Sequence, residues 1–558
     1  MTTRRTFIAG TGALAVIGAG GSEKPLWKAG IVTDTHVGPT RGNCRLVQMA
    51  CDLFASKNVD IFVNCGDIAE RHFPEVYPIL KEITDTAFIS KPPRKIWVYA
   101  NHDYMGRRNE PWEKVMADVK RLLGASNGFY DLVDMQGYPL VVFPEWLDVP
   151  RAERLLCEVC SNPKYAGKPI FVFDHVPPED TTENSVTWGS SARRKLYSRF
   201  PGIINISGHV HASLRCERNI WQGEFTSVNM GCLHAWGGHI VGAAPDIKWN
   251  YGAVVMEVFA DRVVFRRFDV RTKKEYGADE PWTVPLPFKP GSAPYSCGRA
   301  REREPVPQFP AKAVLSLKTA SPFASVEMAF PRARGKHGTY IYKIQIATPA
   351  GKPIAQMEMF GEFYLPEDGR SATVVRSLSA GYFDPGKKYR VRVVPCNCFG
   401  VGGRPIETFF TAPAASCCRT LYNSESPMSE CRFMTGAKGG KRLEPRDGWY
   451  SIAPGDHRLE LPTGIWKAKG RYRFTVEMET RQPDLRAWKF MLRFPGPPQH
   501  DANWRIITPC GNSGRMRYVI EFDHEHPERH YHLFVTDGGN GSIRFGKVKV
   551  EKFESTDN

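Results

Sequence analysis

Short apolar runs alternate with amphipathic stretches through the first half of this 558-residue chain. The runs have the length of buried strands, and the stretches between them, such as 45–57 and 112–123, place apolar residues at helical spacing. We expect strands at 29–33, 61–64, 96–99, 140–143, 170–173 and 203–207, then an antiparallel hairpin from 251–259 and 262–269. This alternation predicts an α/β fold in which helices cover a largely buried sheet.

The rest of the chain has a different pattern. Residues 289–310 are rich in Arg, Pro and Gly and predict a linker after an α/β domain at 27–288. Beyond it, only strand-like runs separated by Pro and Gly turns occur, which predicts two all-β sandwich domains at 311–412 and 417–556.

Each all-β region resembles a known type of domain. The stretch Asp-Pro-Gly-Lys-Lys-Tyr389-Arg-Val-Arg-Val-Val resembles a fibronectin type III domain, and the resemblance implies that Tyr389 is its tyrosine-corner residue. The last region resembles a carbohydrate-binding module. Its tryptophans either stack on sugar rings or fill the core, which is the commoner role of aromatic residues in a sandwich. They are Trp449, Trp466, Trp488 and Trp504.

The first 22 residues have the character of a targeting segment. Arg4 and Arg5 precede Phe7 and an uncharged stretch rich in Gly and Ala, which resembles a twin-arginine export signal. The stretch is too short and too weakly apolar to span a bilayer, so we expect a removable signal peptide at 1–22 and a periplasmic or extracellular protein. No later segment of the sequence has transmembrane character.

Composition constrains the partners only loosely. The chain carries 75 Lys and Arg against 59 Asp and Glu, and the net charge of +16 favours anionic partners as much as it favours solubility alone. Fourteen cysteines show no disulfide framework. Cys157 and Cys160 form a single CxxC on a predicted helix, where we expect buried or disulfide-bonded cysteines rather than a zinc site.

Five polar motifs follow the predicted strands, and their order is the strongest functional signal in the chain. Any one of them alone is common in loops, but five in this order are not. The motifs are Asp34-Thr-His36, Gly66-Asp67-Ile-Ala-Glu70, Asn101-His102-Asp103, His175 and Gly208-His209-Val-His211. Carboxylate, amide and imidazole groups together suit transition metals, and strand ends are rigid enough to hold two such ions.

The ordered motifs resemble those of the calcineurin-like metallophosphoesterases. The resemblance implies an α/β/β/α sandwich and two divalent or trivalent ions of Mn, Fe, Zn or Co, whose identity the sequence leaves open. It places Asp34, His36 and His211 at the first metal, Asn101, His175 and His209 at the second, and Asp67 between them. A hydroxide shared by the metals would then attack phosphorus.

The resemblance also implies the catalytic residues. His102 corresponds to the histidine that contacts the phosphoryl group and protonates the leaving oxygen, and Asp103 would orient it. Ala100 stands where the family has glycine, and Glu70 stands where aspartate is common, but neither change removes a ligand. We also expect His234 near the substrate.

These observations favour an exported hydrolase of phosphomonoesters or phosphodiesters. The alternative is a protein that binds a glycan or surface polymer through its β domains and carries a vestigial metal domain, but every ligand position is intact. Nucleic acid is a poor candidate partner because no recognised binding motif accompanies the basic charge.

Overall fold

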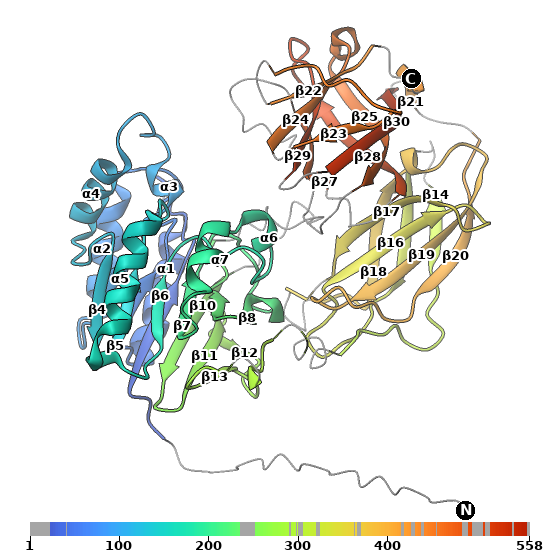
Figure 1. The fold of residues 1–558 in the computed structure, drawn as a ribbon. Helices are drawn as coiled ribbons and strands as arrows, with labels where there is room; N and C mark the ends of the chain where they lie inside the picture. The colour runs from blue at the N-terminus through green and yellow to red at the C-terminus, as the bar shows by residue number, and fades with distance from the viewer. Residues whose placement is uncertain are drawn as a thin grey trace, which may run out of the picture.

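The computed structural model describes residues 23–554, except 41, 235–250, 290–291, 297, 299–304, 320–323, 362, 365–369, 415–417, 426–429, 437–439, 454, 482–488, 494–505, 508–513 and 538–540. The expected signal peptide lies outside the described residues. Figure 1 shows an α/β part that contains every long helix, followed by two parts built of strands. No helix of the described residues is long and apolar enough to cross a membrane.

The first sheet of the α/β part has the order β12-β11-β10-β1-β2-β3, with β13 beside β11. Strands β1, β2 and β3 are parallel, and β10 and β11 form the expected antiparallel hairpin and join the sheet beside β1. The strands are β1 (Trp27–Val32), β2 (Ile61–Asn64), β3 (Arg94–Trp97), β10 (Gly252–Val258), β11 (Arg262–Asp269), β12 (Lys274–Tyr276) and β13 (Trp282–Pro285).

A second sheet has the order β4-β5-β6-β7-β9-β8. Three of the predicted strands lie here rather than in the first sheet, and β5, β6, β7 and β9 run parallel. The strands are β4 (Asp131–Met135), β5 (Tyr138–Val142), β6 (Ile170–Phe173), β7 (Ile203–Ser207), β8 (Ile220–Gln222) and β9 (Thr226–Asn229).

The two sheets pack face to face and helices cover both outer faces, which makes four layers. Side chains such as Ile31 from β1 and Phe171 from β6 share the core between the sheets. On the outer faces, helices α1, α2 and α4 cover the first sheet, and α5 and α7 cover the second. The helices are α1 (Cys44–Ser56), α2 (Val76–Ala87), α3 (Asn101–Tyr104), α4 (Trp112–Leu123), α5 (Val149–Ser161), α6 (Ser185–Trp188) and α7 (Ser191–Tyr197). Because these strands are buried on both faces, their sequences are continuously apolar.

The third and fourth sheets enclose one core after residue 310. Their orders are β14-β15-β18 and β17-β16-β19-β20. The hydroxyl of Tyr389 accepts a hydrogen bond from the backbone N–H of Asp384 at 2.7 Å, which is the contact a tyrosine corner makes. The strands are β14 (Ser316–Thr319), β15 (Ser325–Pro331), β16 (Ile341–Ala347), β17 (Pro353–Phe360), β18 (Thr373–Ser379), β19 (Lys388–Cys396) and β20 (Ile406–Thr411). The fibronectin type III resemblance itself stays a prediction.

Two further sheets enclose the last core. Their orders are β21-β30-β25-β28, with β23 beside β30, and β22-β24-β29-β26-β27. The strands are β21 (Cys418–Glu425), β22 (Arg432–Thr435), β23 (Tyr450–Ile452), β24 (Gly455–Glu460), β25 (Gly470–Arg481), β26 (Lys489–Arg493), β27 (Ile506–Ile507), β28 (Gly514–His524), β29 (His532–Asp537) and β30 (Gly541–Phe553).

The two described tryptophans of this last region do not form an exposed aromatic surface. Trp466 is fully buried in the core. The guanidinium groups of Arg481 and Arg544 lie 4.0 and 4.7 Å from the centre of the Trp449 ring. Trp488 and Trp504 lie outside the described residues. A sugar-stacking role for Trp466 is therefore wrong.

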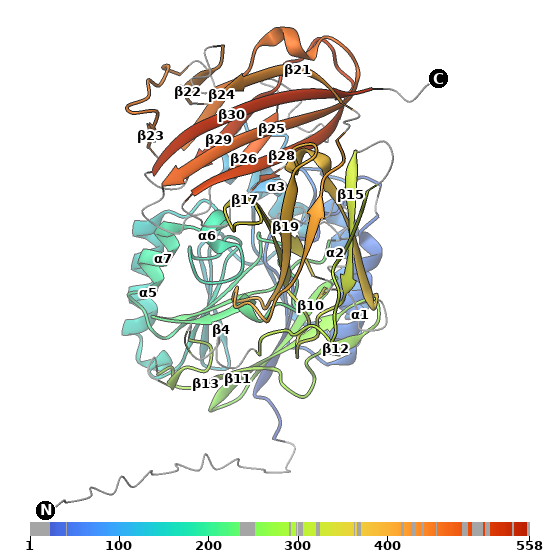
Figure 2. The same ribbon diagram turned by 90° about the vertical axis from the view of Figure 1, so that its right-hand side faces the viewer.

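The expected linker is docked onto the α/β part over at least some of its length. Tyr295 is buried in the core between the first two sheets, and its backbone exchanges hydrogen bonds with Gln222 of β8. A second buried contact joins the α/β part to the following sheets, where the Tyr340 hydroxyl donates to Glu183 at 2.6 Å. The first β domain is thus packed against the α/β part (Figure 2).

Cys157 and Cys160 are free thiols. Cys157 and Cys160 are exposed, so the expectation that they are buried or disulfide-bonded is wrong. The reason is their place on α5, which buries Ala152, Leu156 and Val159 and leaves both cysteines outside this buried face.

Candidate metal centre

The residues of the five motifs converge where strands of both sheets end. Residues 34 and 36 follow β1, 67 follows β2, 175 follows β6, and 209 and 211 follow β7. Asn101 begins the short helix α3 after β3. Because the carboxyl ends of parallel strands share one edge of a sheet, residues far apart in sequence meet in one buried site.

The backbone of this site has an unusual conformation. Five of the motif residues have φ angles between 40° and 70°, in the left-handed region that non-glycine residues rarely adopt. They are Asp34, His36, Asp67, His209 and His211. Backbone held in this region by its surroundings is typical of functional sites.

Two glycines make room for the site. A Cβ on Gly208 would lie well inside contact distance of the Thr33 hydroxyl and the Asp34 carboxylate. A Cβ on Gly66 would lie 2.6 Å from Nδ1 of His175, and φ at Gly66 is 100°. The missing side chain at 208 lets the backbone N–H of His209 donate to both oxygens of Asp34, at 2.9 and 3.2 Å.

One group of ligand atoms lies around Asp34. Its Oδ1 is 2.9 Å from Nε2 of His211 and 3.9 Å from Nε2 of His36, and these two nitrogens are 3.1 Å apart. Oδ2 of Asp67 lies 3.8 Å from Nε2 of His36. The four ligand atoms are mutually close enough to hold one metal ion.

A second group lies on the other side of Asp67. Its Oδ2 is 3.2 Å from Nε2 of His175, which in turn is 3.2 Å from Nδ1 of His209. The terminal amide group of the Asn101 side chain lies 3.2 Å from Oδ1 of Asp67. Asp67 therefore belongs to both groups, and the structure brings together all seven residues for which the sequence predicts metal binding.

The histidine rings are held by partners outside these groups. Nδ1 of His175 donates to the carbonyl oxygen of Cys65 at 2.8 Å, because a carbonyl can only accept. Nδ1 of His36 lies 3.1 Å from the Glu70 carboxylate. In each ring the nitrogen that faces the site is left to bind a cation, as in metal sites whose ligands are fixed by a second hydrogen bond.

The electrostatics of the site favour positive charge. Burial opposes ionisation of Asp67, but the adjacent His175 ring holds the pKa of its carboxyl well below the usual range. Burial by itself would lower the pKa of His175, yet Asp67 and Asp34 raise it to about 10. Burial and the neighbouring His175 lower the pKa of His209 to about 3. Paired ring nitrogens about 3 Å apart beside two buried carboxylates fit a site built for cations rather than for protons.

A comparison with known families agrees with this geometry. Residues 28–213 match the calcineurin-like phosphoesterase family. These residues form a calcineurin-like metallophosphoesterase domain. No curated protein is significantly similar to the chain in sequence.

Three solved structures with some likeness to this chain each cover just under half of it. A dimetal phosphatase from Danio rerio is 11% identical with a TM-score of 0.33, over 47% of this chain and 100% of that one. A purple acid phosphatase from yellow lupin (Lupinus luteus) is 12% identical with a TM-score of 0.32, over 47% and 54%. A predicted phosphoesterase from Streptococcus pneumoniae is 11% identical with a TM-score of 0.24, over 46% and 97%.

His102 of the metallophosphoesterase domain lies at the rim of the metal site. Its half-buried ring packs edge-on against His36, with 4.5 Å between ring centres, and its backbone N–H donates to Asp67 at 3.1 Å. Nδ1 of His102 donates to the carbonyl oxygen of Glu70 at 2.8 Å. Nε2 is thereby the nitrogen available to a substrate.

Asp103 has a different position from the one expected. Its buried carboxylate accepts hydrogen bonds from the backbone of Ile68 and Ala69, at 3.3 and 3.1 Å, and from the Tyr77 hydroxyl. Burial raises the pKa of Asp103 to about 7. Within the described residues it makes no side-chain contact with the His102 ring, so the Glu70 carbonyl has the orienting role that the resemblance implied for Asp103. Asp103 holds the loop that carries Asp67.

Sequence reasoning missed a group of supporting residues. Glu145 accepts from the backbone N–H of Asn101 at 2.6 Å. Arg193 is buried and donates to both oxygens of Asp174, at 2.6 and 3.0 Å, and to the carbonyl of Glu145 at 2.8 Å. These contacts tie together the loops before Asn101 and His175. Glu145 follows a predicted strand in the same way as the ligands do, and that position is the signal that could have identified it.

A cavity of about 380 Å³ opens beside the metal site. Its lining includes the loop residues Thr40 and Asn43 together with His36, Glu70 and His234. The centre of the His234 ring lies 5.4 Å from that of His36, and its place near a substrate stays a prediction.

Arg107, which follows the third motif, is paired with acidic side chains. Arg107 makes two contacts with Glu110, at 2.5 and 2.7 Å, and one with Asp118 at 2.9 Å. Arg107 is therefore an ion-pairing residue of the surface.

Proposed function

We propose that this chain is an exported phosphoesterase that uses two transition-metal ions to hydrolyse a phosphomonoester or phosphodiester. The observation that carries the proposal is the position of Asp67, which belongs to two adjacent groups of buried ligand atoms. A carboxylate shared by two ligand groups is what a two-metal site needs. The export signal is supported by sequence alone, through Arg4, Arg5 and the uncharged stretch after them.

The ligands have distinct tasks in this proposal. Asp34, His36 and His211 would hold one ion, Asn101, His175 and His209 the other, and Asp67 both. When bound, the two ions would supply Lewis acidity toward the phosphoryl oxygens and make water nucleophilic near neutral pH.

The protein's own groups complete the reaction. His102 lies at the rim of the site and has its Nδ1 fixed on the Glu70 carbonyl, so its Nε2 would carry the proton for the leaving oxygen. The cavity beside His36 would receive the part of the substrate that leaves or remains outside the metal site. Its lining by Thr40, Asn43 and His234 favours a polar group there.

One experiment tests the proposal. The protein without residues 1–22 would be loaded with Mn²⁺ and tested on a panel of phosphomonoesters and phosphodiesters, beside Asp67→Asn and Asp134→Asn. Asp134 is a matched control because it pairs with Lys164 on the edge strand β4 and belongs to neither group of ligands. We expect Asp67→Asn alone to lose metal, measured by elemental analysis, and turnover. A wild-type protein that binds two metals but hydrolyses none of the esters would refute the enzymatic function and favour a binding protein.

A further inference from the structure

Two cysteines from different domains meet where the first β domain packs against the α/β part. Cys216 lies between β7 and β8, and Cys398 lies in the loop after β19. Both belong to one cluster of buried side chains, in which Cys216 comes from the α/β part and the other members come from the first β domain. The two side chains interact directly, and 1% and 6% of their residues is exposed. The fold thus places two thiols that are distant in sequence beside each other.

Polar contacts hold the two cysteines in place. Nη1 of Arg218 donates to the carbonyl oxygen of Cys398 at 3.4 Å, and Nε of the same arginine lies 3.3 Å from the Glu183 carboxylate. Glu183 accepts from the Tyr340 hydroxyl at 2.6 Å, and its other oxygen lies 4.0 Å from Sγ of Cys216. Because these contacts cross the interface, they fix the two domains relative to each other around the thiol pair.

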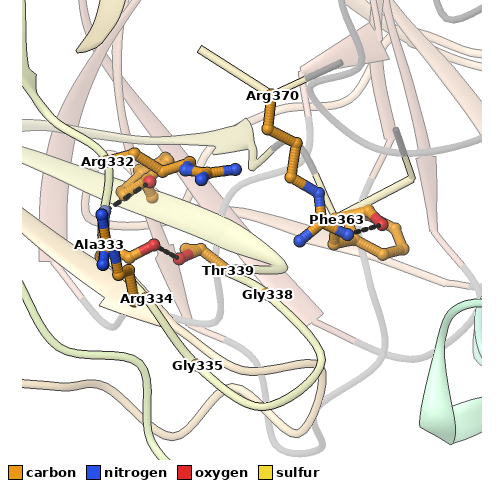
Figure 3. A pocket seen from close by; sticks show the side chains of 9 residues that line it. Arg332, Ala333, Arg334, Gly335, Gly338, Thr339, Phe363 and Arg370 are labelled. Atoms are coloured by element: carbon orange, nitrogen blue, oxygen red, sulfur yellow. Dashed lines mark hydrogen bonds between the residues drawn. The ribbon is translucent and has the colours of Figure 1, made fainter. Parts of the chain in front are cut away.

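Apolar side chains of the first β domain complete the cluster. Ile341, Phe360 and Phe363 are buried in it together with the cysteines. Figure 3 shows Phe363 and the hydrogen bond that its carbonyl oxygen accepts from Arg370 at 2.9 Å. This bond holds the segment that carries the ring. Dissolved oxidants and reductants therefore have little access to the thiols while the domains are docked.

Burial also controls the reactivity of the pair. Burial raises the pKa of the Cys216 thiol well above its usual range, and the neighbouring Cys398 thiol adds to this effect. A thiolate rather than a thiol attacks a disulfide, so the docked pair reacts slowly. Exchange with an oxidant therefore needs the two domains to be apart, and a bond formed in this way is shielded once they dock.

We propose that Cys216 and Cys398 form a disulfide that locks the first β domain onto the α/β part. The structure records both residues as thiols, which is the reduced form. The oxidant is itself a disulfide, either oxidised glutathione or that of a thiol–disulfide oxidoreductase. One cysteine thiolate attacks it and releases one thiol, and the second cysteine then attacks the mixed disulfide and releases the other, so that two protons and two electrons pass to the oxidant. An exported chain meets such oxidants, so the inference uses the proposed export but not the proposed hydrolysis.

Mass spectrometry of the full chain tests for the bond. The protein would be equilibrated with reduced and oxidised glutathione in urea below its unfolding transition, so that the domains separate and dock repeatedly. It would then be alkylated and digested without reductant. We expect a crosslinked pair of peptides that contains Cys216 and Cys398. Absence of this pair from the wild-type protein would overturn the proposal.

Two variants locate the bond and test its effect. Cys396 is the matched control, because it lies in the same cluster but its Sγ is 3.7 Å from the carbonyl oxygen of Val394 in its own strand. Cys398→Ser should lose the crosslink to Cys216, and Cys396→Ser should retain it. The oxidised wild type should unfold at higher urea than the reduced protein, because a crosslink between distant residues restricts the unfolded chain, and Cys398→Ser should lose this shift. A crosslink that depends on Cys396 instead, or equal unfolding midpoints of the oxidised and reduced wild type, would contradict the proposed lock.

Discussion

Replacement of Gly208 by alanine isolates the role of one backbone position in the metal site. The new Cβ would collide with the Thr33 hydroxyl and the Asp34 carboxylate, both buried and unable to move freely. Overpacking of this kind lowers the free energy of unfolding by about 1–3 kcal/mol. The Asp34 carboxylate must also withdraw by about 1 Å, and misplacement on that scale reduces turnover on the order of 10²-fold.

Gly202→Ala is the matched control, because it makes the same change at the other end of the same strand. The nearest atom to a Cβ at 202 is the Lys168 carbonyl oxygen, at 4.0 Å, so alanine fits there. Urea unfolding would measure stability, and hydrolysis of p-nitrophenyl phosphate and bis-p-nitrophenyl phosphate would measure turnover. Should Gly208→Ala match Gly202→Ala in turnover, the close approach of residue 208 to Asp34 does not position the carboxylate, and our account of the site fails.

Three further predictions follow from individual contacts. His102→Ala should retain both metals by elemental analysis and lose about 10²–10⁴-fold in turnover. The loss should be larger for an alkyl ester than for a p-nitrophenyl ester, and equal losses would exclude acid catalysis by this ring. Tyr340→Phe removes a buried hydrogen bond to Glu183 and should lower the free energy of unfolding by about 1.5–3 kcal/mol in urea, whereas an unchanged value would show that the contact adds nothing. Burial opposes ionisation of Glu217, but the ion pair with Arg267 lowers the pKa of its carboxyl. This ion pair therefore stabilises the folded protein at pH values above the unfolded pKa of about 4.3. The contribution is lost as the pH falls through the lower folded pKa. Glu217→Gln should therefore be less stable than wild type at pH 7, and the difference should shrink as the pH falls below the unfolded pKa of about 4.3. A difference independent of pH would contradict this assignment.

The fold of the α/β part was largely predictable because a strand that is buried on both faces has a continuous apolar sequence. The run at 61–64 matches β2, and the helical spacing at 112–123 matches α4. Strand β9 escaped notice because its sequence, Thr-Ser-Val-Asn, is mostly polar although buried. Ser227 in β9 donates to Asn205 in β7 at 3.2 Å, so a hydrogen bond between strands replaces apolar character there.

The ligand types of the site were predictable from motifs, but their supports were not. His102 is oriented by a backbone carbonyl, and His175 is oriented by another, at Cys65. A carbonyl group is present at every residue and leaves no trace in a sequence. The link from Arg193 to Asp174 joins residues 19 positions apart across a loop, where sequence spacing indicates no contact.

The left-handed backbone at five ligand positions has a consequence for the evolution of this domain. Each such residue opposes folding by about 1–2 kcal/mol, although aspartate and histidine tolerate the conformation better than most. Glycine at Asp34 or His209 would relieve the backbone and remove a buried polar side chain, so loss of function and gain of thermal stability should arise together. A lineage freed from the need for this chemistry would gain stability by replacing these residues with glycine.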